Sequence, residues 1–568
     1  MGYPFVLNSV PSISTIQEML LHSARVFGQK LALEDLKETP FPKLTYSSLL
    51  ETVLRFGGAL RKLGLKERAH LAIVSENRVQ WGLSYLTCMA FNYVVVPIDK
   101  NLAINEILNI IHESDASAVI YSDTFEPILS ERRGSLRRLK TYINMDLPAK
   151  RDRTLSMVEL LEKSPGFRVE DLPRIEPDAM AEVLFTSGSL GRAKGVMLSQ
   201  KNIASNLTSM VSMVLVTSED RFLSVLPIHH SYECTCGFLC PLYTGASVHY
   251  ARSLKTVVDD LQIARATMLL GVPLLFDKMF KRIHKAIHEK KVTSVVIGPL
   301  IKATNVLEKI GWKSSKRQIF KEIHEKFGGH IRLFIAGGAA PDPLVARGLR
   351  ELGFGFLQGY GLTETAPILA LNHPAYHKDD AAGLPLPGVS LKINKPDPHG
   401  VGEVWAKGPN VMLGYYKNEQ ATRDTFEDGW FKTGDLGYRD EDGFLHIAGR
   451  MKNVIISRSG ENVYPEELED LLKRSPYILE CMIYGEEDKK LDEIIAVQIV
   501  PDAEAFIEHS ETRGVEITNE LMQSIIGDEI TKLNSQVAAF KQIRKFYLRD
   551  REFEKTTTQK VKRFLVKK

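Results

Sequence analysis

LFTSGSLGRAKGVMLS, residues 184–199, has the composition of a loop that holds a phosphate group. Glycine lets backbone N–H groups approach an anion closely, and serine and threonine hydroxyls add further donors. The stretch differs from the G-x-x-x-x-G-K-[ST] loop, because Lys194 follows an alanine and the next run, GVMLS, predicts a strand rather than a helix. We therefore expect a glycine-rich turn between two strands, which by itself is equally typical of a solvated hairpin.

Helical and extended patterns alternate on both sides of this turn. The stretch YSSLLETVLRFGGALRKLG, residues 46–64, has apolar residues at helical spacing. Short runs rich in β-branched residues predict strands at 70–77, 93–99, 117–123, 221–227, 246–251, 267–273, 331–339 and 354–361. Such alternation predicts an α/β fold with mostly parallel or mixed sheets covered by helices.

The pattern changes near residue 401 to short strands with glycine-rich turns, as in GEVWAKGP and GWFKTGDLGY. A boundary is predicted near GRMKNVIISRSGENVYPEELE, followed by a helix at 465–474, two strands and a basic tail. A chain of 568 residues is too long for one core. We therefore expect a large N-terminal domain over 1–450 and a small, mobile α+β domain over 451–568.

The composition is that of an ordinary globular enzyme, with 25% charged residues and a net charge of +3. This near balance argues against a dedicated nucleic-acid binder, which normally has a strongly basic domain. Five cysteines, an odd and low number, predict reduced thiols and a cytoplasmic protein. The most apolar stretch, CTCGFLCPLYTGASVHYA, is interrupted by Gly, Pro and His, so no transmembrane helix is expected.

Two further glycine-rich segments carry polar side chains where strand patterns end. QGYGLTETAP, residues 358–367, offers the flat ring of Tyr360, the hydroxyl of Thr363 and the carboxylate of Glu364. A glutamate beside a phosphate loop suits Mg²⁺, which usually takes one or two carboxylates together with substrate phosphates. In KTGDLGY, the carboxylate of Asp435 could accept both hydroxyls of a ribose, although a Gly-Asp pair alone more often marks a turn.

Seven motifs in one order resemble those of the adenylate-forming, or AMP-binding, enzyme family. They are FTSGSLGRAKG, LPIHHSYE, QGYGLTETAP, GEVWAKGPNVMLGYYKN, WFKTGDLGY, GRMKNVIISRSGENVYPEELE and TTTQKVKR. That family includes acyl-CoA synthetases, amino-acid adenylation domains and beetle luciferases, and the resemblance runs from about residue 45 to the end. It implies that the loop holds the β- and γ-phosphates of ATP while a carboxylate attacks the α-phosphorus and expels pyrophosphate. The acyl-adenylate then reacts with a thiol.

The resemblance implies a set of site residues, position by position. Those implied in catalysis are Thr186, His230, Glu364 and Lys560. Those implied in nucleotide or cosubstrate binding are Ser187, Gly188, Ser189, Gly191, Lys194, Gly359, Tyr360, Thr363, Asp435, Arg450 and Gly460. Within these sets, Glu364 would hold Mg²⁺, Tyr360 would stack on adenine and Thr363 would touch the α-phosphate. Asp435, helped by Arg450, would bind the ribose, and Lys560 would bridge the carboxylate and the α-phosphate.

Three positions depart from the family pattern. Leu190 stands where the family often has threonine, Ala193 where it often has proline, and Gln559 where a glycine usually precedes the tail lysine. The first change removes a hydroxyl from the pyrophosphate loop. Lys452 falls at the family's hinge position, so the small domain is expected to rotate after adenylation. That rotation would replace the tail lysine by a face that includes Gly460.

Three features indicate the substrate. Amino-acid-activating relatives carry an aspartate for the substrate ammonium where this chain has His230, so a free amino acid is disfavoured. The segment SYECTCGFLCPLYTG has small and apolar residues at helical spacing, which suits an apolar acyl tunnel. The variant SRSGENVYPEELE most resembles bacterial long-chain fatty-acid–CoA ligases. We therefore expect a medium- to long-chain fatty acid as substrate and CoA as acceptor.

Three alternatives to this function stay open. The first is the loading of a free acyl carrier protein, since no L-G-G-x-S carrier site follows within this chain. The second is a luciferase-like oxygenase, and the third is an enzyme that adenylates another carboxylate.

A basic segment raises the question of membrane contact. Residues 281–326 contain 12 Lys and Arg against 4 Asp and Glu, interleaved with Ile and Phe. One interpretation is a solvated helical cover. The other is peripheral contact with an anionic membrane, such as the inner membrane surface, into which the fatty acid partitions.

Overall fold

The computed structural model describes residues 2–186, 193–289, 291–310, 312, 315–457, 461–488, 492–555 and 561–563. The chain forms two compact units. The large unit comprises Met1–Ser390 and Ala406–Phe431, and the small unit comprises Leu391–Trp405 and Lys432–Lys568. These units are defined by contacts within each of them, whereas the boundary expected at residues 450–451 separates segments that would move relative to each other. That boundary stays a prediction.

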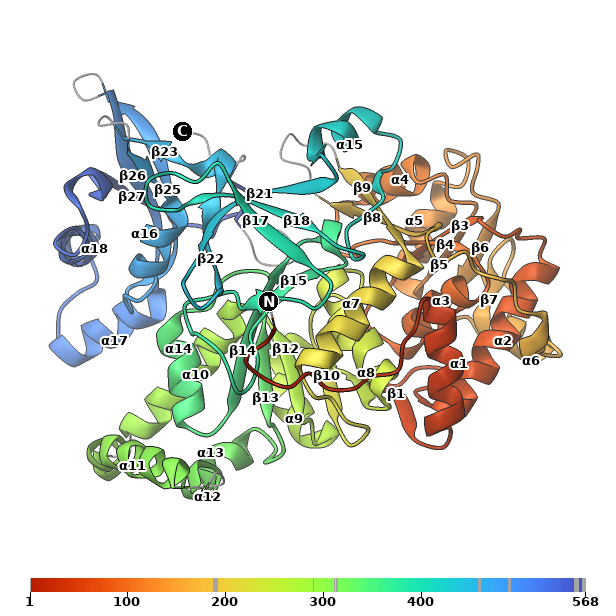
Figure 1. Ribbon diagram of the computed structural model, residues 1–568, viewed down its shortest axis with the longest axis horizontal. Helices are drawn as coiled ribbons and strands as arrows, with labels where there is room; N and C mark the ends of the chain where they lie inside the picture. Colours follow the sequence, from red (N-terminus) through yellow and green to blue (C-terminus); the bar gives the residue numbers. More distant parts are fainter. Residues whose placement is uncertain are drawn as a thin grey trace. The chain divides into compact units, whose positions relative to one another are not determined.

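Two mostly parallel sheets make up the large unit (Figure 1). The strands of the nine-stranded sheet are, in spatial order, β16 (Leu384–Pro385), β15 (Ile368–Leu371), β14 (Gly355–Gly361), β13 (Leu333–Ala336), β12 (Met268–Gly271), β10 (Arg221–Ser224), β11 (Ser247–Tyr250), β1 (Leu31–Asp35) and β2 (Lys43–Thr45). The strands of the eight-stranded sheet are β19 (Gly414–Tyr415), β9 (Lys194–Ser199), β8 (Met180–Thr186), β4 (Val94–Pro97), β3 (His70–Val74), β5 (Ala118–Tyr121), β6 (Thr141–Asn144) and β7 (Leu155–Ser156).

The helices of the large unit lie between and around these strands (Figure 1). They are α1 (Ile16–Phe27), α2 (Tyr46–Lys62), α3 (Val79–Ala90), α4 (Ile104–Glu113), α5 (Glu126–Glu131), α6 (Met157–Lys163), α7 (Gln200–Met213), α8 (Cys240–Thr244), α9 (Val257–Ala264), α10 (Pro273–Glu289), α11 (Lys291–Lys309), α12 (Ser315–Ile319), α13 (Lys321–Lys326), α14 (Pro343–Glu351) and α15 (Glu419–Thr425). Among the described residues, none of the helices combines the length and apolarity needed to cross a bilayer.

The strand and helix expectations are confirmed in this unit. Each predicted run from 70–77 to 354–361 contains one observed strand, and the helix expected at 46–64 is α2. The run GVMLS is strand β9, which pairs antiparallel with β8, so the glycine-rich stretch does join two strands. Apolar runs without alternation mark strands that are buried on both faces, which is why they were recognisable in the sequence.

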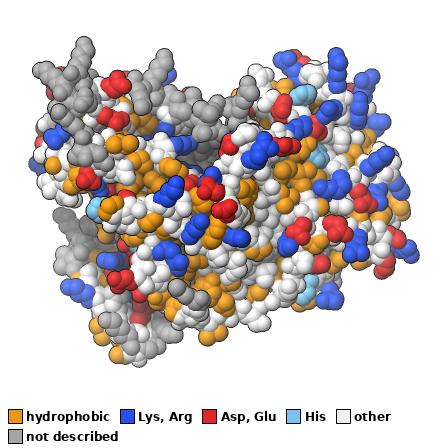
Figure 2. Space-filling view, turned by 45° about the horizontal axis from the view of Figure 1, so that its top comes forward, with side chains coloured by type: hydrophobic (Ala, Val, Ile, Leu, Met, Phe, Trp, Pro, Cys, Tyr) orange, Lys and Arg blue, Asp and Glu red, His pale blue; other side chains and the backbone are white. Residues whose placement is uncertain are grey.

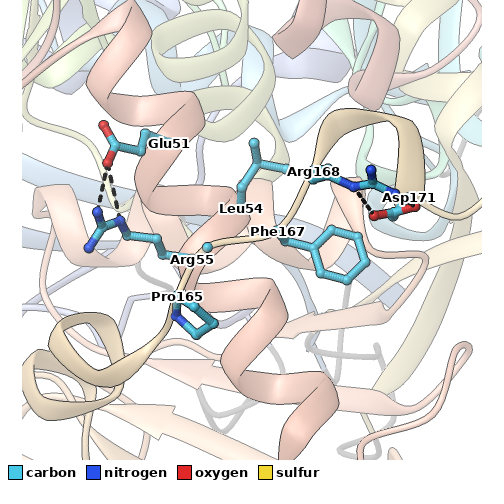
Figure 3. A pocket seen from close by; sticks show the side chains of 8 residues that line it. Glu51, Leu54, Arg55, Pro165, Phe167, Arg168 and Asp171 are labelled. Carbon is cyan, nitrogen blue, oxygen red and sulfur yellow. Dashed lines mark hydrogen bonds and ion pairs between the residues drawn. The ribbon is translucent and has the colours of Figure 1, made fainter.

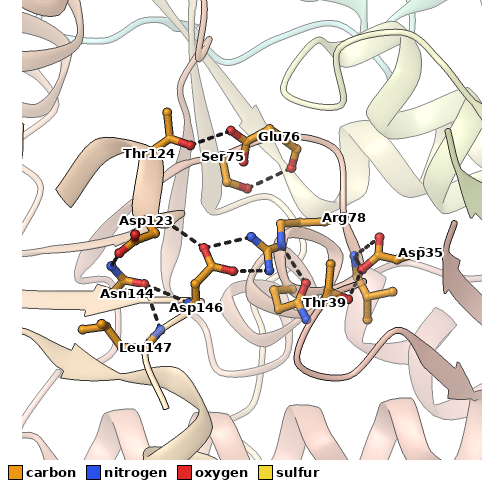
Figure 4. Close-up of polar contacts among 12 residues, drawn as sticks. Asp35, Thr39, Ser75, Glu76, Arg78, Asp123, Thr124, Asn144, Asp146 and Leu147 are labelled. Atoms are coloured by element: carbon orange, nitrogen blue, oxygen red, sulfur yellow. Dashed lines mark hydrogen bonds and ion pairs between the residues drawn. The ribbon is translucent and has the colours of Figure 1, made fainter. Parts of the chain in front are cut away.

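A polar cluster ties the two sheets together near the carboxyl ends of their strands (Figure 4). Asp35, at the end of β1, accepts the N–H of Val79 at the start of α3, with distances of 3.1 and 3.2 Å to its two oxygens. Arg78, which follows β3, donates through both terminal nitrogens to Asp146, beyond the end of β6, at 3.1 and 2.6 Å. Burial raises the pKa of Asp35 to about 6. These contacts hold the strand ends where functional loops usually emerge.

The strands of the small unit pair mostly antiparallel, although β26 and β27 are parallel neighbours. Its strands are β17 (Ser390–Asn394), β18 (Gly402–Lys407), β21 (Trp430–Arg439), β22 (Leu445–Arg450), β23 (Ile455–Ile456), β24 (Asn462–Val463), β25 (Ile478–Asp488), β26 (Asp492–Pro501) and β27 (Lys545–Leu548), while β20 (Phe426–Glu427) pairs with the first residues of β21. Its helices are α16 (Pro465–Leu472), α17 (Ala503–Arg513) and α18 (Asn519–Asn534). The helix expected at 465–474 and the strands expected after it are therefore confirmed.

Candidate active site

The two ends of the predicted phosphate loop face each other across the β8–β9 hairpin. Thr186, the last residue of β8, is opposite Lys194, the first residue of β9. The Thr186 hydroxyl donates to the carbonyl oxygen of Lys194 at 3.5 Å, the outer limit of a hydrogen bond. The other predicted loop residues lie outside the described residues; they are Ser187, Gly188, Ser189 and Gly191.

A tyrosine links this hairpin to the predicted magnesium ligand. Tyr415 lies on β19, which pairs with β9, and the ammonium of Lys194 lies 4.7 Å from the centre of its ring. The Tyr415 hydroxyl donates to Glu364 Oε1 at 3.0 Å. Three segments that lie between positions 194 and 415 of the sequence therefore place a cation, a ring and a carboxylate together. A cation over an aromatic face is electrostatically favourable, so the ring holds the lysine near the hairpin end.

Glu364 is presented by a tight turn at the carboxyl end of β14. Near the end of that strand, Gly359 pairs with Leu371 of β15 and Tyr360 pairs with Ala370. A Cβ added at Gly361 would lie 1.8 Å from the carbonyl oxygen of Pro367, so only glycine fits where the chain folds back.

The residues that follow form a single 3₁₀ turn, Thr363–Thr365. In this turn the Thr363 hydroxyl accepts a hydrogen bond from the hydroxyl of Ser231 at 3.4 Å. The turn that carries Glu364 therefore also contacts the segment that carries His230.

His230 lies in a turn that follows β10, and the backbone of this turn is hydrogen-bonded to a residue that follows a strand of the other sheet. Asn77, beyond the end of β3, accepts the N–H of Ile228 at 3.1 Å and donates to the carbonyl of Leu226 at 2.6 Å. His230 Nδ1 accepts the N–H of Tyr232 at 3.3 Å.

The side chain of the adjacent His229 is largely but not fully buried, and burial lowers the pKa of its imidazole. Its Nε2 lies 3.7 Å from a carboxylate oxygen of Asp99, which follows β4. The charge of Asp99 opposes the effect of burial on the pKa of His229. The turn after β10 is thus held at its backbone by Asn77, which follows β3, and at His229 by Asp99, which follows β4.

The segment expected to line an acyl tunnel begins as a π-helix rather than an α-helix. The π-helix spans Glu233–Leu239 and continues into α8, and all its residues are buried. Such wide turns occur mostly as short insertions at functional sites. The carboxyl group of Glu233 packs on Gly237, where an added Cβ would be 2.7 Å from its carbon. Burial raises the pKa of Glu233 to about 8, so this carboxyl is mostly protonated at neutral pH.

In the small unit, the predicted ribose ligands are direct cross-strand neighbours. Asp435 on β21 is opposite Arg450 on β22, and the Arg450 Nε lies 2.8 Å from Asp435 Oδ1. The N–H of Asp435 donates to the hydroxyl of Thr433 at 3.1 Å, and that hydroxyl donates to the carbonyl of Val404 at 2.6 Å. Gly434 between them has a φ of +69°, which favours glycine because it has no Cβ. The carboxylate is therefore held in one orientation.

The predicted hinge lysine follows immediately. Lys452 lies in the 3₁₀ turn Met451–Asn453 at the end of β22. Burial and the nearby charge of Arg450 lower the pKa of Lys452, while the carboxylate of Asp435 opposes this effect. Gly460 and Lys560 lie outside the described residues.

A separate groove lies elsewhere on the large unit, between α2 and residues 165–171 (Figure 3). Its volume is about 390 Å³, and it is lined by Glu51, Leu54, Arg55, Pro165, Gly166, Phe167, Arg168 and Asp171. Arg55 pairs with Glu51 at 3.0 Å, and Arg168 pairs with Asp171 at 2.7 Å. Its cations are thus already neutralised, and it includes none of the predicted site residues.

Among the residues that the motif reading did not single out, Tyr415 is the most informative. It lies within the quoted motif GEVWAKGPNVMLGYYKN, so the signal was present, but nothing local indicates that its hydroxyl reaches Glu364. Asn77 and Asp99 were also missed, because a polar residue after a strand is common in any α/β fold.

The chain matches two described protein families over most of its length. Residues 20–416 match the family described as AMP-binding enzyme, and residues 452–568 match the AMP-binding enzyme C-terminal domain. The chain belongs to the AMP-binding enzyme family. The resemblance expected from the ordered motifs is thereby confirmed.

Individual relatives share this family, and two of them differ in the thiol acceptor that they are named for. A long-chain-fatty-acid–CoA ligase of Mycobacterium bovis is 27% identical over 548 residues, which cover 89% of this chain and 87% of the relative. A long-chain-fatty-acid–[acyl-carrier-protein] ligase of Arabidopsis thaliana is 26% identical over 592 residues, covering 90% of this chain and 79% of the relative. These relatives are AMP-binding acid–thiol ligases, and this AMP-binding chain is an enzyme of the same class.

Solved structures confirm the expected fold. The o-succinylbenzoate–CoA synthetase of Bacillus subtilis, in complex with ATP and magnesium ion, matches with a TM-score of 0.72 at 23% identity. The match covers 96% of this chain and 98% of that one. The fold is thus the adenylate-forming one, with a large N-terminal part of mixed sheets and a smaller C-terminal part.

Proposed function

We propose that this enzyme activates a medium- to long-chain fatty acid with ATP and transfers the acyl group to CoA. In the first step, a carboxylate oxygen attacks the α-phosphorus of ATP, and the bond to the bridging oxygen breaks to release pyrophosphate. In the second step, the sulfur of CoA attacks the acyl carbon and AMP leaves. The observation that carries the proposal is the convergence of Lys194, Tyr415 and Glu364 beside the β8–β9 hairpin.

The first step depends on charge neutralisation, since phosphoryl chemistry asks mainly for positioning and electrostatic stabilisation. In our proposal the loop after Thr186 receives the β- and γ-phosphates, and Lys194 leaves the Tyr415 ring to pair with them. Thr363, in the 3₁₀ turn after β14, contacts the α-phosphate. Tyr360, on β14, stacks on adenine. The hydroxyls of the ribose donate hydrogen bonds to the carboxylate of Asp435, which Arg450 already orients.

Glu364 fits a magnesium ion by the chemistry of its surroundings. Its carboxylate accepts a hydrogen bond from the hydroxyl of Tyr415 on Oε1, which orients the group without neutralising it. No group of three or more His, Cys, Asp or Glu side chains able to cage a metal occurs among the described residues. An ion held by Glu364 would thus take phosphate oxygens as further ligands, as Mg²⁺ usually does. When bound, the ion would neutralise charge on the departing pyrophosphate.

In the second step we propose that Lys452 acts as the hinge of the small domain. Rotation there would withdraw Lys560 and bring the face with Gly460 towards the acyl-adenylate, so that the thiol can approach. A hinge residue absorbs changes in backbone dihedral angles and need not be small.

The fatty-acid substrate is supported by two local features and by the relatives. His230 stands where a cationic substrate would require a carboxylate, and the buried π-helix after it offers apolar side chains. The M. bovis relative is named for long-chain fatty acids. An acyl carrier protein as acceptor is the second candidate, supported by the A. thaliana relative. All five cysteines are buried thiols, which fits our proposal of a reducing, cytoplasmic location.

A thioester assay across carboxylates of increasing chain length tests the substrate. We expect medium- and long-chain fatty acids to form thioesters with CoA, with release of pyrophosphate rather than orthophosphate, and amino acids to be ignored. The panel should contain acetate, C8 to C18 acids, aryl acids and the common amino acids, each with CoA and with acyl carrier protein. Pyrophosphate exchange driven by an amino acid, with none driven by fatty acids, would overturn the proposal.

The tyrosine beside Glu364 can be tested separately. Tyr415→Phe keeps the ring under Lys194 but removes the hydrogen bond to the carboxylate, so we expect roughly a tenfold loss of kcat/KM, larger at low Mg²⁺. Tyr415→Leu removes the ring as well and should raise the KM for ATP further. Equal activity of Tyr415→Phe and the wild type at every Mg²⁺ concentration would show that the bond does not orient Glu364.

We also propose that the enzyme contacts an anionic membrane peripherally, as its basic segment 281–326 indicates.

A further inference from the structure

Helix α11 has two faces with different surroundings. Ile297, Leu300 and Ile301 pack against a hydrophobic core cluster of the large unit, and Thr304 is fully buried. These positions follow the three-and-four spacing of one helix face. That face therefore already has its partner within the fold.

The outward face of the same helix carries apolar side chains that this packing does not use. Val306 on α11 is 60% exposed. Ile310, the first residue after the end of α11, is 74% exposed, and its N–H donates to the carbonyl of Val306, so it lies one turn later on the same side. Lys302, one turn earlier on the same side, is exposed as well. An outward helix face is ordinarily polar, so two large aliphatic residues there require an explanation.

Two further exposed apolar side chains follow within nine residues. Trp312 is 49% exposed and Ile319, on α12, is 40% exposed. The backbone of Trp312 is fixed, because its N–H donates to the carbonyl of Leu307 at 2.9 Å and its carbonyl accepts from Ser315 at 3.2 Å. Single exposed apolar residues are normal, whereas several in a short stretch mark an interaction surface. We call Lys302, Val306, Ile310, Trp312 and Ile319 the α11–α12 corner.

The segment that carries the corner is basic in composition, which favours an anionic partner. In the segment 281–326, lysines and arginines outnumber acidic residues 12 to 4. Two of the acids are already paired, Glu308 with Lys316 at 2.7 Å and Glu325 with Lys321 at 3.5 Å. Elsewhere, on the face shown in Figure 2, acidic and basic side chains are interspersed.

The corner is also accessible within the large unit. Helices α10 to α13 occupy the long connection between the neighbouring parallel strands β12 and β13. In Figure 1, α11 and α12 lie at the periphery of this unit, away from the strands of both sheets. A flat partner could therefore reach the corner without displacing other elements.

We infer that the α11–α12 corner docks on an anionic lipid bilayer. Val306, Ile310, Trp312 and Ile319 enter the boundary between headgroups and acyl chains, and Lys302 pairs with lipid phosphates. Tryptophan and lysine together suit this boundary, because the indole is amphipathic and the lysine stem is apolar up to its charged end. The inference deepens the peripheral contact proposed above and does not depend on the adenylation chemistry.

Vesicle sedimentation of the full-length protein tests the inference. Vesicles of phosphatidylcholine alone are compared with vesicles containing 30% phosphatidylglycerol, a composition chosen as the probe, at low and high salt. We expect binding to the anionic vesicles to weaken as salt rises. The double variant Val306→Ser, Ile310→Ser should bind roughly tenfold more weakly or worse. Leu254→Ser is the matched control, since Leu254 is 69% exposed elsewhere on the same unit, and it should bind as the wild type does.

Tryptophan fluorescence gives an independent readout. The chain has four tryptophans, and Trp81 and Trp405 are buried. Anionic vesicles should shift the emission of the wild type to the blue, and Trp312→Phe should lose most of this shift while keeping its fold by circular dichroism. Equal vesicle binding by the wild type and the double variant, or binding that ignores both lipid charge and salt, would overturn the inference. A failure of the wild type to bind any vesicle would do the same.

The outcome for docking is distinguishable from the outcome for catalysis. Corner variants should form thioester from a water-soluble C8 acid at the wild-type rate, because none of the corner residues belongs to the candidate active site. A wild type that binds vesicles but forms no thioester would contradict the proposed function and leave the docking surface standing. Loss of thioester formation in the corner variants alone would contradict the assignment of the corner to docking.

Discussion

Glu364→Gln is expected to lower ATP-dependent thioester formation about 10²–10³-fold while leaving the fold intact. Glutamine has the same size, and its amide oxygen can still accept the hydrogen bond from Tyr415, so packing around the turn should be preserved. What is lost is the negative charge that would hold Mg²⁺ against the departing phosphates. The deficit should therefore grow as the Mg²⁺ concentration falls, which steady-state kinetics across a Mg²⁺ titration would measure.

The matched control is Glu419→Gln. Glu419 lies on α15 of the same unit with its side chain 89% exposed, so its loss should leave the rate and the Mg²⁺ dependence unchanged. Circular dichroism and thermal unfolding of both variants exclude a global effect. Full activity of Glu364→Gln at low Mg²⁺ would show that this glutamate is only a solvated loop residue that bonds to Tyr415.

Lys560→Ala is expected to separate the two half-reactions. If the ammonium offsets charge where the carboxylate meets the α-phosphate, its removal should lower acyl-adenylate formation by about 10²–10³-fold. When acyl-adenylate and CoA are supplied instead, thioester should form near the wild-type rate, because the small domain would then have rotated that lysine away. Pyrophosphate exchange measures the first half-reaction, and single-turnover thioester formation measures the second.

Two further variants sharpen this test. Gly460→Leu should do the reverse, adenylating normally while blocking the approach of the thiol. Lys562→Ala removes a neighbouring cation of the same tail and should affect neither step, because the bond of Lys562 to the carbonyl of Glu554 is made by its backbone N–H and survives the substitution. An equal slowing of both half-reactions in Lys560→Ala, or of neither, would contradict the proposed role of the lysine.

Much of the fold could be predicted because its signals are local. The run VVVP of β4 and the run MLLG of β12 are buried on both faces, so they appear as continuous apolar stretches. The apolar spacing of α2 is likewise contained within one short segment. The π-helix at Glu233–Leu239 was expected only as a helix, since the apolar spacing of seven residues does not distinguish a wide turn from an α-helical one.

The candidate site was predicted residue by residue, but its contacts were not. The sequence named Asp435 and Arg450 as separate ligands, whereas the ion pair between them depends on the register of β21 against β22. In the same way, the position of Lys194 over the ring of Tyr415 follows from the pairing of β19 with β9. Register is set by long-range strand pairing, which local spacing does not specify.

The sequence by itself determined the family, the order of the motifs and the residue types that ATP, a carboxylate and a thiol would meet. It could do so because each motif is a short run whose chemistry is legible without its neighbours. Only the tertiary structure decided that Tyr415 orients Glu364 from 51 positions away, and that Val306 on α11 and Ile310 at its end face outward. These facts depend on which distant segments pack together and which helix face the core covers, and packing of that kind is a property of the whole fold.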